Sequence, residues 1–404
     1  MIAWLVLAVL FFIWATRPRF KFRDAALALN VVSLGLVVTS LAQINSDVQK
    51  GSGHYVRAKN AAVQNLVRPK NPPDVYYFIL DSYGRADLLK KTYGYDNSEF
   101  IKGLEERGFY VAECSMSNYV RTEISLGSTF NMMYLQDLDP AFSPESTRRS
   151  VLWDSLKHSA ARYNFESMGY KTIGFATGFA WNELEDADLF YTPASISMGM
   201  AEFEVLFLQT TLARYMNDLH WIDPDNIMGQ NFRDRTMNVF HRLDDIARNP
   251  EPTYAYIHLI SPHPPFVFGP NGEPTYPPDF WNKNREYPAD LYAKGYQNQL
   301  TFLNKKILQA VDTILANSDT PPIIVIQGDH GPWLQTNERR MWILNAYYLP
   351  GHNDRLYSTI TPVNTFRVIF DAYFGGSYGK LPDVSYFSPV PKLYEFSEIP
   401  NRCE

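Results

Sequence analysis

The stretch that decides the fold is IIVIQGDHGPW, residues 323–333. Its first four residues are all β-branched and apolar, which predicts a short strand buried on both faces, as strands of a parallel sheet are. The strand ends at a glycine, after which Asp329 and His330 stand side by side. A polar turn that closes the strand is one explanation of this pair. The other is a metal site, of which these two side chains supply half.

Apolar runs of the same kind alternate with helical patterns from residue 74 onward. Strands are predicted at residues 75–80, 109–112, 170–176, 254–260 and 323–326. One helix is predicted at residues 97–108, where capping residues open it and a glycine ends it. Another follows from the apolar stripe Leu300, Leu303, Ile307, Val311 and Ile314. This alternation predicts an α/β domain, a three-layer αβα sandwich whose central sheet is largely parallel.

The composition narrows the class of protein. The chain has 404 residues, 46% of them hydrophobic, so it can bury a large core. Its net charge of -6 argues against a nucleic-acid partner, because such proteins usually carry a basic surface. Two cysteines, Cys114 and Cys403, are too few for a disulfide framework. A single bridge in an oxidising compartment is one alternative, and two unpaired thiols, which we favour, are the other.

The N-terminus predicts two transmembrane segments within residues 1–44. Residues 2–15 are apolar but short for a span, whereas residues 25–44 are free of charge and long enough. Four cations in the loop at residues 16–24 place that loop in the cytoplasm, so the chain beyond residue 44 lies outside. A cleaved signal peptide is the alternative for the first segment, but it lacks a basic start and a small-residue cleavage site.

These expectations divide the chain into three parts. Because the first apolar segment starts almost at Met1, we expect the two spans to end a longer membrane domain. Residues 45–73 are polar and rich in turn-forming residues, and are predicted to be a juxtamembrane linker. Residues 74–404 are then an extracytoplasmic domain held at the inner membrane, facing the periplasm or the cell exterior.

Polar side chains follow three of the predicted strands. Asp81 follows the first strand, His263 lies in a proline-rich loop after residues 254–260, and Asp329 and His330 follow the last. Because parallel strands present their carboxyl ends at one edge of a sheet, these side chains can converge. Asp81, Asp329 and His330 then suit Zn²⁺ or Mn²⁺. Taken singly, Asp81 would be a helix cap, and His258, in mid-strand, is interpreted as a hydrogen-bonded core histidine.

A nucleophile for such a site is available in residues 117–132, which are crowded with hydroxyl groups. The part that follows Thr122 is predicted to open a helix, and a hydroxyl at a helix N-terminus lies where backbone N–H groups favour an anion. A metal ion would lower the pKa of that hydroxyl and make it a usable nucleophile. A capped helix without chemistry is the alternative. Arg121 and Glu123 flank Thr122 and could orient a phosphate, or could be solvated loop charges.

Six segments in this order resemble the alkaline phosphatase/sulfatase superfamily. They are PDVYYFILDSYGRADLL, SNYVRTEISLGSTFNMMYL, YIHLISPHPPFVF, YQNQLTFLNKKI, IIVIQGDHGPW and NAYYLPG, and the resemblance covers residues 74–350. Within the superfamily, the chain resembles membrane-anchored sulfatase-like proteins related to lipoteichoic acid synthases and lipid A phosphoethanolamine transferases. The resemblance implies an alkaline phosphatase-like fold.

The resemblance also implies roles for individual residues. The metal ligands would be Asp81, Thr122, Asp329 and His330, holding one or two divalent ions, Zn²⁺ or Mn²⁺. Thr122 would be the catalytic nucleophile, with Ser125 in reserve. His263 would be catalytic and face the substrate.

Two further residues, Arg121 and Trp333, are candidates for substrate binding. A position just after the Asp-His-Gly-Pro run places Trp333 at the rim of the site, where packing alone would also explain an aromatic side chain.

The sequence departs from true sulfatases at one signature. Cys114 is followed by Ser-Met-Ser-Asn rather than by the x-Pro-x-Arg of the sulfatase motif, which argues against sulfate-ester hydrolysis. Relatives of the synthase type often carry glutamate where Asp81 stands, which leaves the metal open.

The expected function is therefore a metal-dependent transferase or hydrolase of phospho- or phosphodiester groups. It would act at the outer face of the membrane on lipid headgroups or surface glycans, through a threonine nucleophile. The alternatives are a sulfuric-ester or phosphodiester hydrolase, and a catalytically inactive scaffold in envelope assembly.

Overall fold

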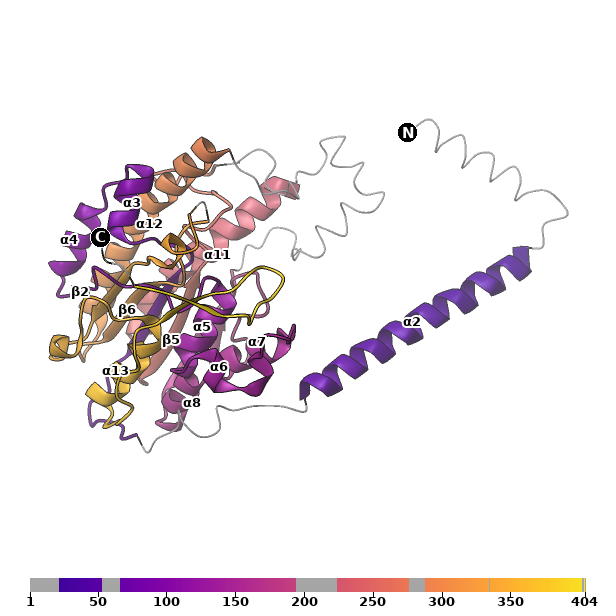
Figure 1. Cartoon of the computed structure of the whole chain (residues 1–404), viewed down its shortest axis with the longest axis horizontal. Coiled ribbons are helices and arrows are strands. Elements are labelled where there is room, and N and C mark those ends of the chain that lie inside the picture. Colours follow the sequence, from indigo (N-terminus) through magenta and orange to yellow (C-terminus); the bar gives the residue numbers. More distant parts are fainter. Residues whose placement is uncertain are drawn as a thin grey trace. The chain divides into compact units, whose positions relative to one another are not determined.

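The computed structural model describes residues 22–52, 66–193, 224–275, 288–333, 335–401 and 403 (Figure 1). The chain forms two units, Met1–Tyr55 and Val56–Glu404. The first unit contains the helix α2 (Phe22–Ser52), which includes the second predicted membrane segment. The first predicted segment, residues 2–15, lies outside the described residues. No helix in the described part of the chain is both long enough and apolar enough to cross a membrane, so the predicted spans are not confirmed.

The second unit is built from alternating strands and helices. Its strands are β1 (Val75–Leu80), β2 (Tyr110–Val111), β3 (Lys171–Phe175), β4 (Leu189–Tyr191), β5 (Thr253–Leu259), β6 (Ile323–Gly328), β7 (Asn345–Tyr348), β8 (Ser385–Phe387) and β9 (Ser397–Ile399). Its α-helices are α3 (Ala86–Tyr93), α4 (Ser98–Glu105), α5 (Thr122–Asn131), α6 (Leu135–Leu138), α7 (Ser150–Lys157), α8 (Ala160–Ser167), α11 (Pro224–Ala247), α12 (Ala289–Asn317) and α13 (Thr365–Tyr373). Short 3₁₀ helices are η1 (Pro140–Phe142), η3 (Arg339–Met341), η4 (Asn353–Arg355) and η5 (Pro362–Asn364).

The central sheet has the strand order β2-β7-β6-β1-β5-β3-β4 within the described residues. β1 lies between β6 and β5 and pairs parallel with both, and β3 pairs parallel with β5 and β4. Only β7 runs antiparallel to its neighbours in the described sheet, which are β6 and β2. The prediction of a largely parallel sheet is therefore confirmed.

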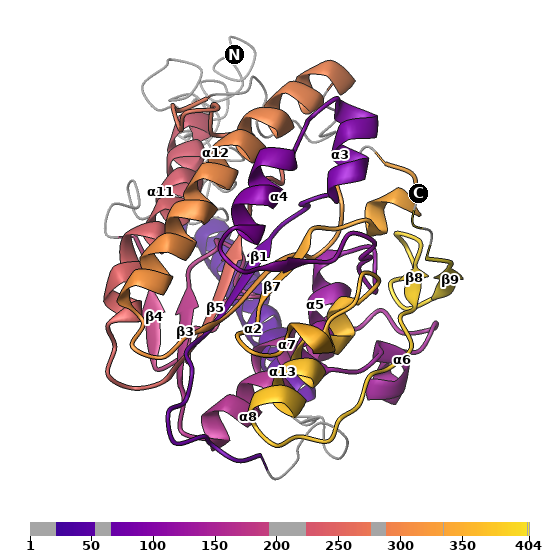
Figure 2. The same ribbon diagram turned by 90° about the vertical axis from the view of Figure 1, so that its left-hand side faces the viewer.

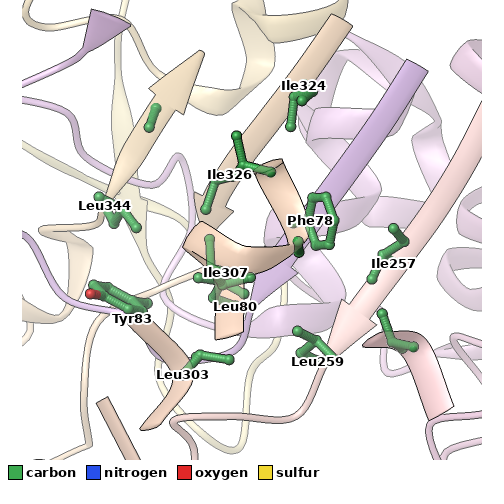
Figure 3. Packing of buried hydrophobic residues seen from close by; sticks show 14 of the residues in the cluster. Phe78, Leu80, Tyr83, Ile257, Leu259, Leu303, Ile307, Ile324, Ile326 and Leu344 are labelled. Atoms are coloured by element: carbon green, nitrogen blue, oxygen red, sulfur yellow. The ribbon is translucent and has the colours of Figure 1, made fainter. Parts of the chain in front are cut away.

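Successive side chains of the buried strands point to opposite faces of the sheet and pack into two separate hydrophobic cores. Phe78, Leu80, Ile257, Ile324 and Ile326 point to one face of the sheet, where Figure 3 shows them packed against Leu303 and Ile307 of α12. This core also receives side chains from α4 and α11. Because all six residues of β1 are buried, the strand contributes to both faces, as its continuous apolar run predicts.

The opposite face of the sheet is covered by a second set of helices. Tyr77, Val325 and Tyr256 pack there with side chains of α5, α8 and α13, among them Phe130 and Phe366. Figure 2 shows α4, α11 and α12 on one side of the sheet and α5, α7, α8 and α13 on the other. The described part of the second unit is thus a three-layer αβα sandwich, as predicted.

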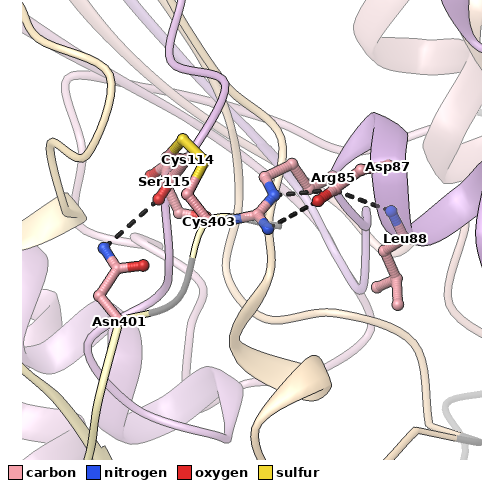
Figure 4. Close-up of a disulfide and its surroundings, with 7 residues drawn as sticks. All are labelled: Arg85, Asp87, Leu88, Cys114, Ser115, Asn401 and Cys403. Atoms are coloured by element: carbon pink, nitrogen blue, oxygen red, sulfur yellow. Dashed lines mark hydrogen bonds and ion pairs between the residues drawn. A yellow bond between two sulfur atoms is a disulfide. The ribbon is translucent and has the colours of Figure 1, made fainter.

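The two cysteines are joined, so the expectation of unpaired thiols is wrong. Cys114 and Cys403 form a disulfide with their Cα atoms 5.2 Å apart. Figure 4 shows the bridge next to Ser115, whose carbonyl oxygen accepts a hydrogen bond from Arg85. Asn401 donates to the carbonyl of Cys114, so the end of the chain is held against the segment that leads into α5. Spatial proximity across 289 residues is a tertiary property that cysteine counting does not detect.

Removing this bridge should destabilise the domain. Cys403→Ser is expected to lower the free energy of unfolding by about 2–4 kcal/mol, because the disulfide restricts a very long loop of the unfolded chain. Urea unfolding of the oxidised chain and of the variant measures the difference, and a reductant should shift only the unchanged chain. Identical unfolding midpoints for the two proteins would contradict the expectation.

Candidate active site

The register of three neighbouring strands brings the predicted ligands together. Leu80, the last residue of β1, lies opposite Gly328 of β6 and opposite Leu259 of β5. Asp81 and Asp329 therefore occupy equivalent positions, one residue beyond adjacent parallel strands. His258 lies one residue before the end of the third strand. All three side chains are at the carboxyl edge of the sheet, where sites of parallel α/β proteins form.

Asp81, His258 and Asp329 form a buried group that could hold a metal ion. One ligand atom from each lies within 4.8 Å of the others. The Nε2 atom of His258 is 3.7 Å from Oδ2 of Asp81. His330 borders the group, with its Nε2 atom 3.6 Å from Oδ2 of Asp329 and 3.9 Å from Oδ1 of Asp81. The structure thus brings together three of the four predicted ligands, Asp81, Asp329 and His330, and adds His258 as a further candidate.

Two buried polar atoms of this group have no hydrogen-bond partner among the described residues and could bind a cation. Oδ1 of Asp329 accepts hydrogen bonds from the backbone N–H groups of Ser82 and His330, each at 2.9 Å. Among the described residues, the buried Oδ2 atom of Asp329 and the buried Nε2 atom of His258 have no hydrogen-bond partner. Buried polar atoms without partners are costly, and two carboxylates so close together repel each other. Oxygen and nitrogen donors of this kind suit Zn²⁺ or Mn²⁺.

Backbone contacts fix the orientation of His330. Its Nδ1 atom donates to the carbonyl oxygen of Gly331 at 2.8 Å, which leaves the lone pair on Nε2 facing the carboxylates. This tautomer is the one that a metal ligand requires. Gly331 is needed here, because a Cβ atom would lie 3.0–3.2 Å from three backbone carbonyl oxygens of the segment 339–342.

Charge around Asp81 favours its ionised form. Burial by itself would raise the pKa of Asp81, but His263, His330 and His258 outweigh burial and hold the pKa below its ordinary value. The hydroxyl of Ser82 also donates to Oδ1 of Asp81 at 3.0 Å. Asp81 therefore carries a negative charge at neutral pH.

Asp81, His258, Asp329 and His330 are called the metal group below. Thr122 is the first residue of α5 and lies at the edge of this group. Its hydroxyl oxygen is 3.3 Å from Nε2 of His330. Ser125, the reserve nucleophile, instead donates its hydroxyl to the backbone carbonyl of Asp329 at 2.8 Å. Ser125 thereby ties α5 to the end of β6, and its hydroxyl is committed to that contact. Of the two hydroxyl groups, only that of Thr122 faces the ligands.

His263 is held beside Asp81 by its own backbone. Its N–H group donates to the carbonyl oxygen of Asp81 at 3.0 Å, and its carbonyl oxygen accepts from Gln299 of α12 at 3.2 Å. Its Nδ1 atom contacts the carbonyl oxygen of Pro264. The ring is half-buried, and the charge effect on Asp81 places it near the metal group.

The remaining candidates lie around the rim. Arg121 donates to the carbonyl oxygen of Ser388 at 3.1 Å, and burial lowers the pKa of its guanidinium. Trp333 is 57% exposed. The interpretation of Glu123 as a solvated loop charge is wrong, because it is buried and bonded to Arg149 at 2.6 Å and Trp153 at 3.0 Å. Glu123 therefore fixes α5 to α7.

Sequence reasoning interpreted His258 as a core residue because it precedes the end of its strand. The residue is indeed buried, and its Nδ1 atom lies 2.8 Å from the amide nitrogen of Asn182. One signal could have identified it. Tyr254, Tyr256 and His258 alternate along β5, which places His258 on the same face of the sheet as α5.

Fold and site together define an α/β protein with a buried group of carboxylates and histidines, which could hold a metal ion, at the carboxyl edge of a parallel sheet. The family model described as Sulfatase matches residues 73–366, which is more than half of the chain. The chain therefore belongs to the sulfatase family, and is a sulfatase-like hydrolase or transferase of the alkaline phosphatase superfamily. No curated protein sequence matches it.

Solved structures show the same fold. The C-terminal periplasmic domain of EcEptC from Escherichia coli, in complex with zinc, is 13% identical to this chain with a TM-score of 0.55. The match covers 83% of this chain and 96% of that domain. A second structure of that EcEptC domain is 12% identical with a TM-score of 0.52, covering 81% and 94% of the two chains. At this identity the likeness concerns the fold alone.

Loss of one carboxylate should abolish metal binding. Asp329→Asn is expected to weaken Zn²⁺ or Mn²⁺ binding by more than about 100-fold, since loss of an outer-shell contact alone costs up to that factor. Elemental analysis after incubation with each metal and desalting measures the bound ion. Asp319→Asn, at an exposed position after α12, is the matched control and should bind metal normally. Equal metal content in both variants would contradict the assignment.

Proposed function

We propose that this protein is a metal-dependent transferase or hydrolase of phospho- or phosphodiester groups, with Thr122 as its nucleophile. The observation that carries the proposal is the contact of 3.3 Å between the Thr122 hydroxyl and Nε2 of His330. That nitrogen also faces Asp81 and Asp329, so the hydroxyl borders the candidate metal ligands. A nucleophile and a cation site that share one edge are what phosphoryl transfer requires.

The residues that would hold the ion are Asp81, Asp329 and His330, with His258 as a further donor. When bound, a divalent ion would favour the deprotonated hydroxyl of Thr122 and offset the negative charge that develops on the phosphoryl oxygens. The free N–H groups at the start of α5 lie next to Thr122 and support binding of the same oxygens.

In the proposed reaction, the Thr122 hydroxyl gives its proton to solvent water, and its oxygen forms a bond to phosphorus. The bond between phosphorus and the leaving oxygen breaks, and His263 donates a proton to that oxygen. His263 then takes the proton of an acceptor hydroxyl or of water while that oxygen attacks the phosphothreonine, and the Thr122 oxygen leaves and regains a proton from solvent. A hydroxyl acceptor makes the protein a transferase, and water makes it a hydrolase.

The proposed location is the outer face of the inner membrane, with lipid headgroups or surface glycans as substrates. Two observations support a compartment outside the cytoplasm. The Cys114–Cys403 disulfide belongs to an oxidising environment. The structurally similar EcEptC domain is described as periplasmic. The resemblance to lipoteichoic acid synthases and phosphoethanolamine transferases supports the substrate class.

Replacement of the nucleophile tests the proposal. Thr122→Ala is expected to lower the turnover of bis(p-nitrophenyl) phosphate by the metal-loaded chain at least about 10³-fold, because the hydroxyl of the other candidate, Ser125, is bonded to the backbone carbonyl of Asp329. Thr122→Ser should retain part of the activity. Intact mass measurement after rapid quenching should detect a chain that carries a p-nitrophenyl phosphate group, an adduct that Thr122→Ala does not form.

Thr313→Ala, which removes an exposed hydroxyl of α12, is the control and should behave like the unchanged chain. Full turnover by Thr122→Ala, or an adduct at another residue, would exclude Thr122 as the nucleophile. Addition of glycerol as an acceptor, followed by product analysis, separates transfer from hydrolysis.

A further inference from the structure

An arginine that the proposed mechanism does not use lies beside the metal group. Arg340 belongs to the 3₁₀ helix η3, and its carbonyl oxygen accepts a hydrogen bond from the N–H group of Gly331 at 2.6 Å. Gly331 directly follows the predicted ligand His330. The backbone of Arg340 is therefore fixed against the segment that contains Asp329 and His330, two of the proposed metal ligands. Arg340 and Gly331 are nine positions apart in the sequence.

The guanidinium group of Arg340 is partly buried, and no carboxylate in the described part of the chain forms an ion pair with it. It lies over the ring of Trp333, 4.4 Å from the ring centroid. Its Nε atom is buried and has no hydrogen-bond partner among the described residues. Burial lowers the pKa of Arg340, while Asp329 and Asp81 act in the opposite direction, so their charges reach it. A guanidinium with a free donor that borders a metal group is arranged to receive an anion.

The charges of the site also call for an anionic ligand. Asp81 and Asp329 together balance one divalent ion. Arg340 and Arg121 are close enough for the charge of Arg121 to lower the pKa of Arg340. Two cations near each other are unfavourable until an anion lies between or beside them. A phosphoryl group supplies that charge, and two of its non-bridging oxygens can accept the paired N–H donors of a planar guanidinium.

We propose that Arg340, stacked on Trp333, is a substrate-binding residue that donates hydrogen bonds to a non-bridging oxygen of the phosphoryl group. The proposal rests on the proposed function, because it takes a phosphoryl group as the ligand of the metal centre. Trp333 keeps the guanidinium in place at the rim, which explains why an aromatic side chain remains 57% exposed there. The role of Trp333 in substrate binding is then to support Arg340.

The neighbouring Arg339 provides a matched control. It lies in the same 3₁₀ helix, but its guanidinium is directed to a different ring, that of Trp342, at 5.9 Å from the centroid. Arg85 lies over that same ring at 4.3 Å. The two adjacent arginines thus have the same charge and the same helix, and differ in the surface that they face.

The test uses the full chain loaded with Zn²⁺ or Mn²⁺ and measures binding of inorganic phosphate by calorimetry. Arg340→Met is expected to weaken phosphate binding about 10- to 100-fold, as loss of a charge-assisted hydrogen bond does. Arg340→Lys, which keeps the charge and loses the planar fork, should fall between Arg340→Met and the unchanged chain. Arg339→Met should bind phosphate within about twofold of the unchanged chain. Metal content should be the same in all four proteins.

Equal phosphate affinity of Arg340→Met and Arg339→Met would overturn the proposal, as would the absence of phosphate binding to the unchanged, metal-loaded chain. Should Arg340→Met fold poorly, Arg340→Lys decides, because affinity equal to that of the unchanged chain would also contradict the role. Turnover of bis(p-nitrophenyl) phosphate separates the two proposals. Arg340-dependent phosphate binding without turnover leaves Arg340 as a phosphate ligand and refutes the proposed function.

Discussion

Two carboxylates, Asp81 and Asp329, are buried at equivalent positions beyond adjacent parallel strands, and this pair constrains everything around it. The register of β1 and β6 places both at the same edge of the sheet. Two negative charges brought so close in a buried place must be offset. His263, His258 and His330 offset part of this negative charge, and they hold the pKa of Asp81 below its ordinary value. The Oδ2 atom of Asp329 nevertheless has no hydrogen-bond partner among the described residues, so it is free to bind a cation.

The position of Thr122, the proposed nucleophile, depends on the same strand end. Ser125 donates to the carbonyl oxygen of Asp329, so one hydrogen bond fixes α5 to the residue that supplies a ligand. Thr122 lies one helical turn earlier, and its hydroxyl meets His330. Glu123 anchors the other side of α5 through Arg149 and Trp153. The helix is thus held from two sides, which fits the precision that a reacting hydroxyl needs.

Much of this arrangement could be predicted from the sequence, because buried parallel strands have a strong local signal. The continuous apolar runs of β1, β5 and β6 identify the strands, and the rule that sites form at carboxyl ends identifies Asp81, Asp329 and His330. The positions of His258 and Arg340 beside these residues could not be found in this way. His258 lies inside its strand, where local pattern suggests packing, and Arg340 reaches the site through a loop whose path is set by tertiary contacts. The prediction that Cys114 and Cys403 are unpaired was wrong for the same reason, because two cysteines that are 289 residues apart give no local signal of pairing.

The central claim is that the buried carboxylates and histidines at the ends of β1, β5 and β6 bind a catalytic divalent ion. Anomalous diffraction from crystals grown with Zn²⁺, recorded on both sides of the zinc absorption edge, tests it directly. The account predicts a peak about 2.0–2.2 Å from a carboxylate oxygen of Asp81, a carboxylate oxygen of Asp329 and Nε2 of His330. Absence of a peak there, with Asp81 and Asp329 bonded only to protein atoms, would contradict it.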